Sequence, residues 1–274
     1  MIVDEKSLVS VAIAGAGTQG VNEAGALSSL LDAGMNVRDL AGTSAGAIIS
    51  GIYALTKDKE VLKSLSISAD YAKLLDFNWF NFLLNQNLNT GKDVRDWLGN
   101  ITDHAKMGDC QIPLKLICGD LDTGGVQVWS NTTHPTMLLA DAIYSSMALP
   151  FIFPPYLDRF VDGGTVRNIP LQFLDGPKKI GIAISNDFTV KRISTFVAKA
   201  TRLLSMLLTD DDTILEALGT AYKIPVVKLP SLGYGFLDRN MTQSEKLELF
   251  NSGYNTMTDY LNSRSGKSWM SRKV

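Results

Sequence analysis

The sequence has few histidines and cysteines. Of its 274 residues only two are histidine, His104 and His134, and two are cysteine, Cys110 and Cys118. The cysteines form no CxxC pair and have no histidine at metal-ligand spacing, so they predict no metal site, and we expect free thiols.

Long hydrophobic runs and a signal sequence are also missing. No apolar stretch approaches the roughly 20 residues that a membrane-spanning helix needs. The N-terminus, MIVDEKSLVS, contains acidic residues and lacks the apolar core of a secretory signal. We therefore expect a cytoplasmic protein whose only contact with membranes is peripheral.

A strong net charge, a linker and a repeat are absent as well. The net charge is -2 and the isoelectric point about 5.7, which gives no indication of nucleic-acid binding. Without a Pro-, Gly- or Ser-rich linker we expect one domain over residues 1–274. It comprises a motif-bearing core (about 8–175), a C-terminal extension of helices and strands (about 176–265) and a frayed tail (266–274).

Short apolar runs alternate with helical patterns along the first half of the chain. Leu8–Ala14 and Val37–Ala41 are predicted strands, and Val21–Asp32 and Ala45–Leu55 are predicted helices. Two successive strand–glycine turn–helix units are typical of an α/β fold with a parallel core. Further predictions are a hairpin of Leu114–Cys118 and Val126–Trp129, helices from Gly91, over Met137–Ser146, over Phe188–Leu208 and over Gln243–Leu261, and a strand over Lys179–Ser185.

Ser44 lies in the pentapeptide Gly42-Thr43-Ser44-Ala45-Gly46, which fits G-x-S-x-G between a predicted strand and a predicted helix. A serine on such a tight turn has strained backbone angles and needs small neighbours, here Gly42 and Gly46. The helix N-terminus behind it supplies positive potential to a developing oxyanion. The pattern predicts a nucleophile, and the alternative is a tight turn that packs a buried helix.

The loop Gly15-Ala16-Gly17-Thr18-Gln19-Gly20 fits G-x-G-x-x-G after the first predicted strand. In dinucleotide-binding folds this pattern is accompanied by an acidic residue at the end of the second strand. Asp32 and Asp39 have about the right spacing, but neither ends that strand. The loop's backbone N–H groups can instead point at an oxyanion beside the serine. A glycine turn without a ligand is the third interpretation.

Asp162 precedes Gly163 and Gly164, and by itself this is an ordinary turn pattern. Both histidines precede Asp162, so the Ser…Asp…His order of α/β-hydrolases is not available. A serine needs a base, and a carboxylate held within hydrogen-bond reach can act as one.

Together these motifs resemble the patatin-like phospholipase family. The likeness extends to Ser145-Ser146-Met147-Ala148-Leu149-Pro150, Phe153-Pro154-Pro155, Asn168-Ile169-Pro170, the hairpin near Asp120–Trp129 and the late Phe236…Gly253-Tyr254 segment, and so covers most of residues 8–262. The resemblance implies a three-layer α/β/α fold with a mainly parallel central sheet, a Ser–Asp dyad and no metal cofactor.

Residue by residue, the resemblance assigns Ser44 as nucleophile, Asp162 as base and Gly15, Ala16, Gly17 and Thr18 as the oxyanion loop, with Gly20, Gly42, Gly46, Gly163 and Gly164 in support. Two positions depart from the family pattern. Ala16 stands where the family often has glycine, so its φ must be negative. Gln19 stands where Lys or Arg is frequent, which lowers the positive charge near the oxyanion and can alter head-group preference.

Two segments are candidates for contact with lipid. Asn78–Leu84 is rich in aromatic residues, and we favour a core segment over an acyl channel or a membrane-interface segment. The predicted helix Phe188–Leu208 has basic residues away from its apolar face, and we favour packing on the sheet over membrane contact. The run Asp210-Asp211-Asp212 is predicted to place negative charge at a helix N-terminus rather than to bind calcium.

The predicted function is a lipid acyl hydrolase of the phospholipase A or lysophospholipase type. It would act through an acyl-enzyme intermediate on lipid at a membrane or micelle surface. One alternative is a catalytically silent lipid-binding or interaction module with the same fold. The other is a dinucleotide-binding oxidoreductase that uses Gly15–Gly20.

Overall fold

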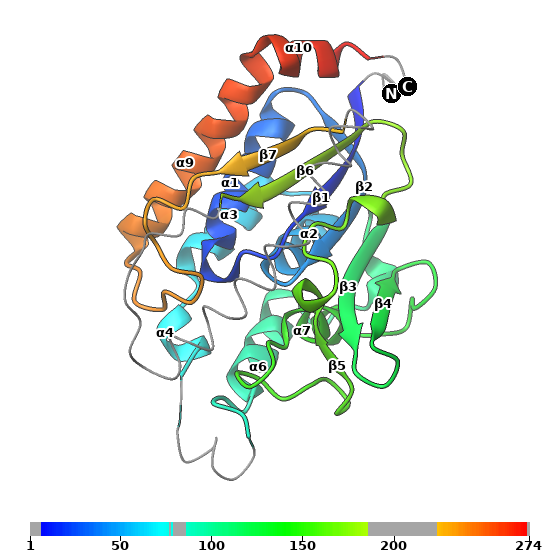
Figure 1. The fold of residues 1–274 in the computed structure, drawn as a ribbon, viewed down its shortest axis with the longest axis vertical. Helices are drawn as coiled ribbons and strands as arrows, with labels where there is room; N and C mark the ends of the chain where they lie inside the picture. The colour runs from blue at the N-terminus through cyan, green and yellow to red at the C-terminus, as the bar shows by residue number, and fades with distance from the viewer. Residues whose placement is uncertain (1–6, 77, 79–85, 186–223, 273–274) are drawn as a thin grey trace.

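A sheet of seven strands forms the centre of the computed structural model, which describes residues 7–76, 78, 86–185 and 224–272 (Figure 1). The strands are β1 (Leu8–Ile13), β2 (Asn36–Thr43), β3 (Leu114–Asp120), β4 (Gly125–Ser130), β5 (Phe160–Asp162), β6 (Lys179–Ile184) and β7 (Val226–Leu229). Their order is β4-β3-β2-β1-β6-β7, with β5 also paired to β3. The pairs β3–β2, β2–β1, β1–β6 and β6–β7 are parallel. Strands β4 and β5 run antiparallel to β3. The predicted α/β fold with a mainly parallel central sheet is confirmed.

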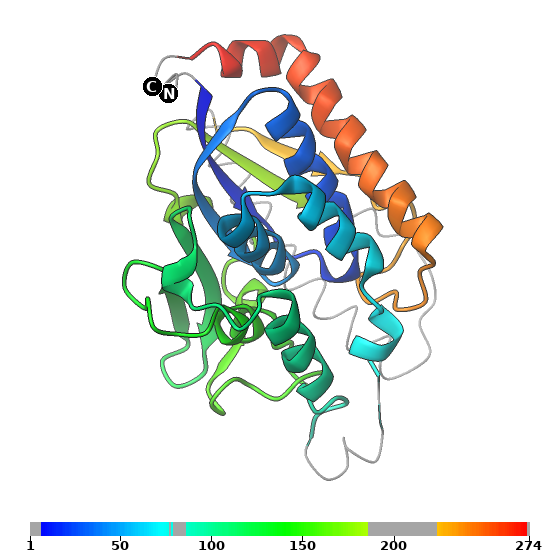
Figure 2. The ribbon, with the colours of Figure 1, turned by 180° about the vertical axis from the view of Figure 1, so that it is seen from behind.

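Helices α1 (Gly20–Asp32), α2 (Ala45–Thr56), α3 (Lys59–Ser68) and α9 (Gln243–Asn262) cover one face of the sheet (Figure 2). Successive side chains of a strand point to opposite faces of the sheet, so every second residue of a strand faces these helices. Val9, Val11 and Ile13 of β1 all point into the large core beneath these helices and are fully buried. The remaining helices are α4 (Tyr71–Leu74), α6 (Lys92–Ile101), α7 (Leu139–Met147) and α10 (Arg264–Met270), with 3-10 turns η2 (Gly17–Gln19), η3 (Met107–Asp109), η4 (Gly163–Thr165) and η5 (Leu171–Phe173).

The opposite face of the sheet presents alanines from three neighbouring strands. In the described residues, the segment that contains Ile169, Leu171 and Leu174 packs on this face in a second apolar cluster. The small alanine side chains let the segment approach the strands closely. It follows directly after β5, so this packing also fixes the chain next to Asp162.

The C-terminal part of the chain continues the same sheet. Strand β6 pairs with β1, β7 pairs with β6, and α9 packs along α1. The predicted hairpin is the antiparallel pair of β3 and β4, and both cysteines are free thiols.

The predicted frayed tail over residues 266–274 is wrong for most of its length, because α10 continues to Met270. The hydroxyl of Ser263 caps this helix by accepting the N–H of Gly266 at 3.0 Å. Trp269 is buried, and its indole N–H donates to the Lys179 carbonyl at 3.1 Å. An N-cap and one buried tryptophan therefore hold a segment whose composition suggests a loose end.

Three predictions lie outside the described residues: the helix Phe188–Leu208, the run Asp210–Asp212 and, except for Asn78, the aromatic segment Asn78–Leu84. Within the described ranges, none of the helices has both the length and the apolar composition that a bilayer crossing requires.

Candidate active site

Ser44 occupies a sharp turn between the last residue of β2 and the first residue of α2. Its φ is 53° and its ψ is -120°, and a positive φ is uncommon for a residue other than glycine. This strained turn places Ser44 at the N-terminus of a helix of 12 residues. The strained strand-to-helix turn predicted from the sequence is therefore present.

The glycines of the pentapeptide are needed because backbone surrounds the turn. A Cβ atom added at Gly46 would lie 2.2 Å from the Ile13 carbonyl oxygen, and one added at Gly42 would lie 2.4 Å from the Gly46 carbonyl oxygen. The Gly46 N–H also donates to the Ala14 carbonyl at 3.1 Å. Larger residues would push α2 away from the end of β1.

Strand β3 brings Ser44 and Asp162 together. Its Ile117 pairs with Thr43 of β2 and, on the same edge, its next residue Cys118 pairs with Asp162 of β5, since β4 occupies the other edge. The residue after Thr43 and the last residue of β5 therefore meet at the same level of the sheet. The Ser44 hydroxyl donates a hydrogen bond of 2.7 Å to Oδ2 of Asp162.

The Asp162 carboxylate is fully buried, and its other oxygen, Oδ1, accepts the N–H of Gly164 at 2.7 Å. Burial raises the pKa of Asp162 to about 6, although the hydrogen bonds from Ser44 and Gly164 act in the opposite direction. Gly163 keeps the turn against β3, since an added Cβ would lie 2.1 Å from the Ile117 carbonyl oxygen. At neutral pH this carboxylate is mostly ionised and can accept a proton.

Two polar side chains without a role in the sequence-based prediction support the site. The Ser44 N–H donates to the hydroxyl of Ser146 on α7 at 3.1 Å, and that hydroxyl donates to the Ile117 carbonyl. The Gly15 N–H donates to Oδ1 of Asn168 at 3.0 Å. Ser146 and Asn168 both lie in the stretches around Asp162 that carry the family resemblance, and this was the available signal.

The loop after β1 lies beside the serine, because a Cβ added at Gly15 would be 3.1 Å from the Ser44 Cβ. Ala16 has a φ of -135°, as its replacement of glycine requires. Of the four predicted oxyanion donors, Gly15 and Thr18 already donate to protein acceptors, Asn168 and the Phe236 carbonyl respectively. In the described part of the chain, the N–H groups of Ala16 and Gly17 donate to no protein acceptor.

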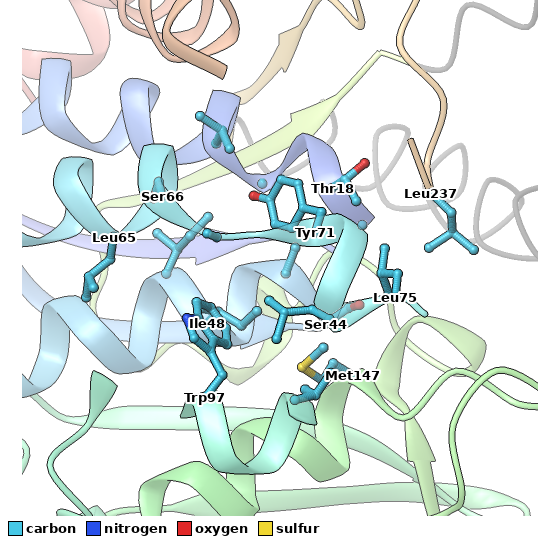
Figure 3. A pocket seen from close by; sticks show the side chains of 18 of the residues that line it. Thr18, Ser44, Ile48, Leu65, Ser66, Tyr71, Leu75, Trp97, Met147 and Leu237 are labelled. Atoms are coloured by element: carbon cyan, nitrogen blue, oxygen red, sulfur yellow. The ribbon is translucent and has the colours of Figure 1, made fainter. Parts of the chain in front are cut away.

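An apolar pocket opens at Ser44 and runs along α2 (Figure 3). The space not filled by protein atoms is about 830 Å³, a figure that includes open solvent at the mouth. Ile48, Ile49 and Ile52 of α2 line one side, and side chains of α3, α4, α6 and α7 line the others. No charged side chain is among the described lining residues, so the pocket suits a hydrocarbon chain.

Neither histidine lines this pocket. His104 is exposed, and its backbone N–H donates to Gly99. His134 packs edge-on against Trp129 of β4, with ring centroids 4.9 Å apart, and its Nδ1 bonds to Thr133. The carboxylate of Asp162 is therefore the titratable group in contact with Ser44.

The acidic residues considered for a dinucleotide site have other contacts. Asp39 is buried within β2, where Oδ2 accepts the Ser10 hydroxyl and Oδ1 accepts the Asp175 N–H. Asp32 forms an ion pair with Lys59. Neither carboxylate lies free at the glycine loop, so the geometry gives the dinucleotide interpretation no support. Among the described residues, no group of three or more His, Cys, Asp or Glu side chains is arranged to hold a metal ion.

Comparison with known proteins gives matches of sequence and of fold. The family model of patatin-like phospholipases matches residues 11–175. YqhO of Bacillus subtilis, described as uncharacterized, is 26% identical over 275 residues, which cover 87% of this chain and 93% of YqhO. Lysophospholipase nte1 of Aspergillus fumigatus is 25% identical over 174 residues, 61% of this chain but 11% of that protein.

Two bacterial proteins of known structure share the fold. VipD from Legionella pneumophila superposes with a TM-score of 0.60 and 14% identity, over 93% of this chain and 66% of VipD. ExoU of Pseudomonas aeruginosa, solved in complex with SpcU, superposes with a TM-score of 0.57 and 14% sequence identity, over 97% of this chain and 53% of ExoU. The chain thus spans just under two thirds of VipD and about half of ExoU. The family model covers more than half of the chain and includes Ser44 and Asp162, so this protein belongs to the patatin-like phospholipase family.

Proposed function

We propose that this protein hydrolyses carboxylic ester bonds of membrane lipids, as a phospholipase A or lysophospholipase, with Ser44 as nucleophile and Asp162 as general base. The observation that carries the proposal is the 2.7 Å hydrogen bond from the Ser44 hydroxyl to Asp162 at one end of an apolar pocket. Membership of the patatin-like phospholipase family supports a lipid ester hydrolase.

In the first half of the reaction, Asp162 accepts the Ser44 proton while Oγ attacks the ester carbonyl carbon. The tetrahedral intermediate collapses, the C–O bond to the alcohol or lysolipid breaks, and the proton passes from Asp162 to the leaving oxygen. In the second half, Asp162 takes a proton from water, which attacks the acyl-enzyme. The fatty acid leaves and Ser44 regains its proton.

The developing negative charge needs donors that are already in place. Among the described residues, the N–H groups of Ala16 and Gly17 have no acceptor and are suited to this role, and so is the N–H of Ala45, the residue after Ser44 and the first of α2. The partial positive charge of the α2 N-terminus adds to them. This set narrows the four predicted oxyanion residues to Ala16 and Gly17 and adds Ala45.

The pocket determines how the substrate lies. Because its lining is apolar, we place the acyl chain along α2 and the glycerol and head group at the open mouth. A lipid presented at a membrane or micelle surface can insert its chain in this way, with the protein in peripheral contact. The mechanism uses no cofactor or metal.

The test is release of fatty acid from vesicles of phosphatidylcholine and from lysophosphatidylcholine micelles. We expect hydrolysis by the wild type and at least a roughly 1,000-fold loss in Ser44→Ala and in Asp162→Asn. Ser50→Ala is the matched control, because Ser50 is a buried serine of α2 whose hydroxyl has no hydrogen-bond partner among the described residues. Wild-type rates in Ser44→Ala or Asp162→Asn would contradict the proposal.

The same experiment separates the alternatives. A catalytically silent lipid-binding module would bind the vesicles in a sedimentation assay without releasing fatty acid. A dinucleotide-binding oxidoreductase would show saturable binding of NADH by fluorescence titration and no loss of that binding in Ser44→Ala.

A further inference from the structure

The loop between β7 and α9 (residues 230–242, hereafter the 230–242 loop) is hydrogen-bonded to the chain that follows β1. The Thr18 N–H donates to the Phe236 carbonyl at 3.0 Å. The Gln19 side-chain amide donates to the Tyr234 carbonyl at 2.8 Å, and that of Asn22 donates to the Pro230 carbonyl at 2.8 Å. Three donors within residues 18–22 thus meet three main-chain carbonyls of the 230–242 loop.

Gly17 shows how close this contact is. Its φ is +56°, and an added Cβ would lie 2.0 Å from the Phe236 carbonyl oxygen. The backbones of the two loops therefore touch at the residue whose N–H is one of the free donors. The position of Phe236 sets how far Gly17 can move from Ser44.

The 230–242 loop also forms part of the acyl pocket. Leu237, the residue after Phe236, lines the pocket on the side of Ser44 where Leu75 also stands, and Leu65 lies at the opposite side (Figure 3). The Arg239 guanidinium donates to the Leu75 carbonyl at 3.1 Å. Leu75 is the C-cap of α4, where helix carbonyls carry partial negative charge and favour a cation.

Lys246, in the first turns of α9 just after this loop, makes a second contact of the same kind. Its buried ammonium donates to the carbonyl of Ala69, the C-cap of α3, and lies 4.7 Å from the centre of the Tyr71 ring. Ala69, Tyr71 and Leu75 all line the pocket. The pocket wall of residues 69–75 is therefore held at both ends by cations from residues 239–246.

From these contacts we propose that the 230–242 loop is a positioning element for both halves of the active site, and that Gln19 and Arg239 are its positioning residues. Gln19 ties the loop to the oxyanion donors Ala16 and Gly17, and Arg239 ties it to the pocket wall. The loop lies outside residues 11–175, which the family model matches. This role in catalysis rests on the proposed function, because the loop would act on the oxyanion donors of that reaction. An oxyanion hole loses effect when its donors shift by a fraction of an ångström.

The first variant is Gln19→Met, which keeps the side chain's length and removes the amide. Gln111→Met is its matched control, since the Gln111 amide also donates to a main-chain carbonyl, that of Leu55, at 2.8 Å, but outside the pocket. With p-nitrophenyl butyrate we expect Gln19→Met to lower kcat about 3- to 10-fold with KM within twofold, the effect of one lost hydrogen bond. Gln111→Met should leave both constants unchanged.

Hydrogen–deuterium exchange of a peptide that contains Gly17 and Thr18 gives a second readout, independent of turnover. In Gln19→Met we expect the Thr18 amide, now held less firmly against Phe236, to exchange about 3- to 10-fold faster. Gln111→Met should not change this peptide.

Arg239 tests the pocket half of the proposal. Arg239→Met is expected to raise KM for p-nitrophenyl decanoate about 3- to 10-fold while kcat for the butyrate ester stays within twofold. Arg239→Lys retains a cationic donor for the Leu75 carbonyl and should restore KM. A lowered melting temperature without this split between substrates would indicate a purely structural role and would overturn the assignment of Arg239.

The outcomes separate the two proposals. If the wild type hydrolyses esters while Gln19→Met changes neither kcat nor exchange, the positioning role of Gln19 is wrong and the proposed function stands. If the wild type hydrolyses no ester, the proposed function and the loop's catalytic role both fail. In that case, the rate of hydrogen–deuterium exchange at the Thr18 amide in Gln19→Met, compared with the wild type, still decides whether the 230–242 loop holds the chain after β1.

Discussion

The Ser44 hydroxyl lies 2.7 Å from Oδ2 of Asp162, although 118 positions separate the two residues in the chain. They meet because β2, which ends just before Ser44, and β5, which ends at Asp162, pair one after the other with the same edge of β3. Asp162 is buried and is also held by the Gly164 N–H. A serine and a carboxylate can therefore exchange a proton directly, with no imidazole between them.

The pH dependence of hydrolysis should follow Asp162. The reaction needs the ionised carboxylate, and burial raises the pKa of Asp162 to about 6. We expect kcat/KM to be constant at neutral pH and to fall about tenfold per pH unit below about 6. Rates of p-nitrophenyl butyrate hydrolysis between pH 4.5 and 8 test this, and a rate that stays level down to pH 4.5 would show that Asp162 is not the base.

Replacing both histidines should leave the chemistry intact. His104 is exposed, and His134 packs on Trp129 away from the pocket. The double variant His104→Asn/His134→Asn is expected to keep kcat within about threefold of the wild type, with the same fall below about pH 6. Its melting temperature serves as the control for the lost contact with Trp129. A loss of several orders of magnitude in a folded variant would assign the base to a histidine.

Asp162→Asn should stabilise the protein while it removes activity. The pKa of Asp162 is raised from 3.8 to about 6, so between these values the folded state holds a proton that the unfolded state has lost. Wild-type stability therefore decreases as pH rises through this window, whereas an asparagine does not ionise. We expect the variant to be more stable by about 1 to 3 kcal/mol at pH 8, and by less at pH 4.

Urea unfolding at both pH values measures this difference. Asparagine can still accept the Gly164 N–H through Oδ1, and its amide can donate to the Ser44 oxygen, so the side chain at position 162 keeps a partner at both ends. An equal or lower stability of Asp162→Asn at pH 8 would contradict the raised pKa of the carboxyl group.

Ile48 should control the length of the acyl chain. It lines the pocket about one helical turn beyond Ser44 and is only partly buried, so a larger side chain can be accommodated there. Ile48→Phe is expected to lower kcat/KM for p-nitrophenyl palmitate at least about tenfold more than for the butyrate ester. Ile48→Val is the control and should preserve the wild-type ratio. Equal effects on both esters would place the acyl chain elsewhere.

The sequence predicted the parts of the fold and site that depend on local pattern. The strained turn at Ser44 needs a strand, small residues and a helix in succession, and all of these lie within about twenty positions. The apolar runs of β1 and β2 and the hairpin of β3 and β4 are likewise local. The pairing of Ser44 with Asp162 is not local, and it was predicted only because the family resemblance and the position of the histidines both indicated Asp162.

Other features depend on contacts that no local pattern encodes. The 230–242 loop reaches the site through its main-chain carbonyls, which are the same for every residue type. The bond from the Thr18 N–H to the Phe236 carbonyl could not be predicted for the same reason, and the bond from the Gly15 N–H to Asn168 Oδ1 joins residues 153 positions apart. The composition of the tail gives no sign that Trp269 is buried and that its indole N–H donates to the Lys179 carbonyl.

The most direct test of the central claim is the reaction of Ser44 with a fluorophosphonate probe, followed by intact-mass and peptide mass spectrometry. The account predicts one adduct, on Ser44, that forms readily in the wild type, at least about 100-fold more slowly in Asp162→Asn, and not at all in Ser44→Ala. The control Ser50→Ala should label like the wild type. An unlabelled wild type, an adduct on another serine, or undiminished labelling of Asp162→Asn would contradict a dyad of Ser44 and Asp162.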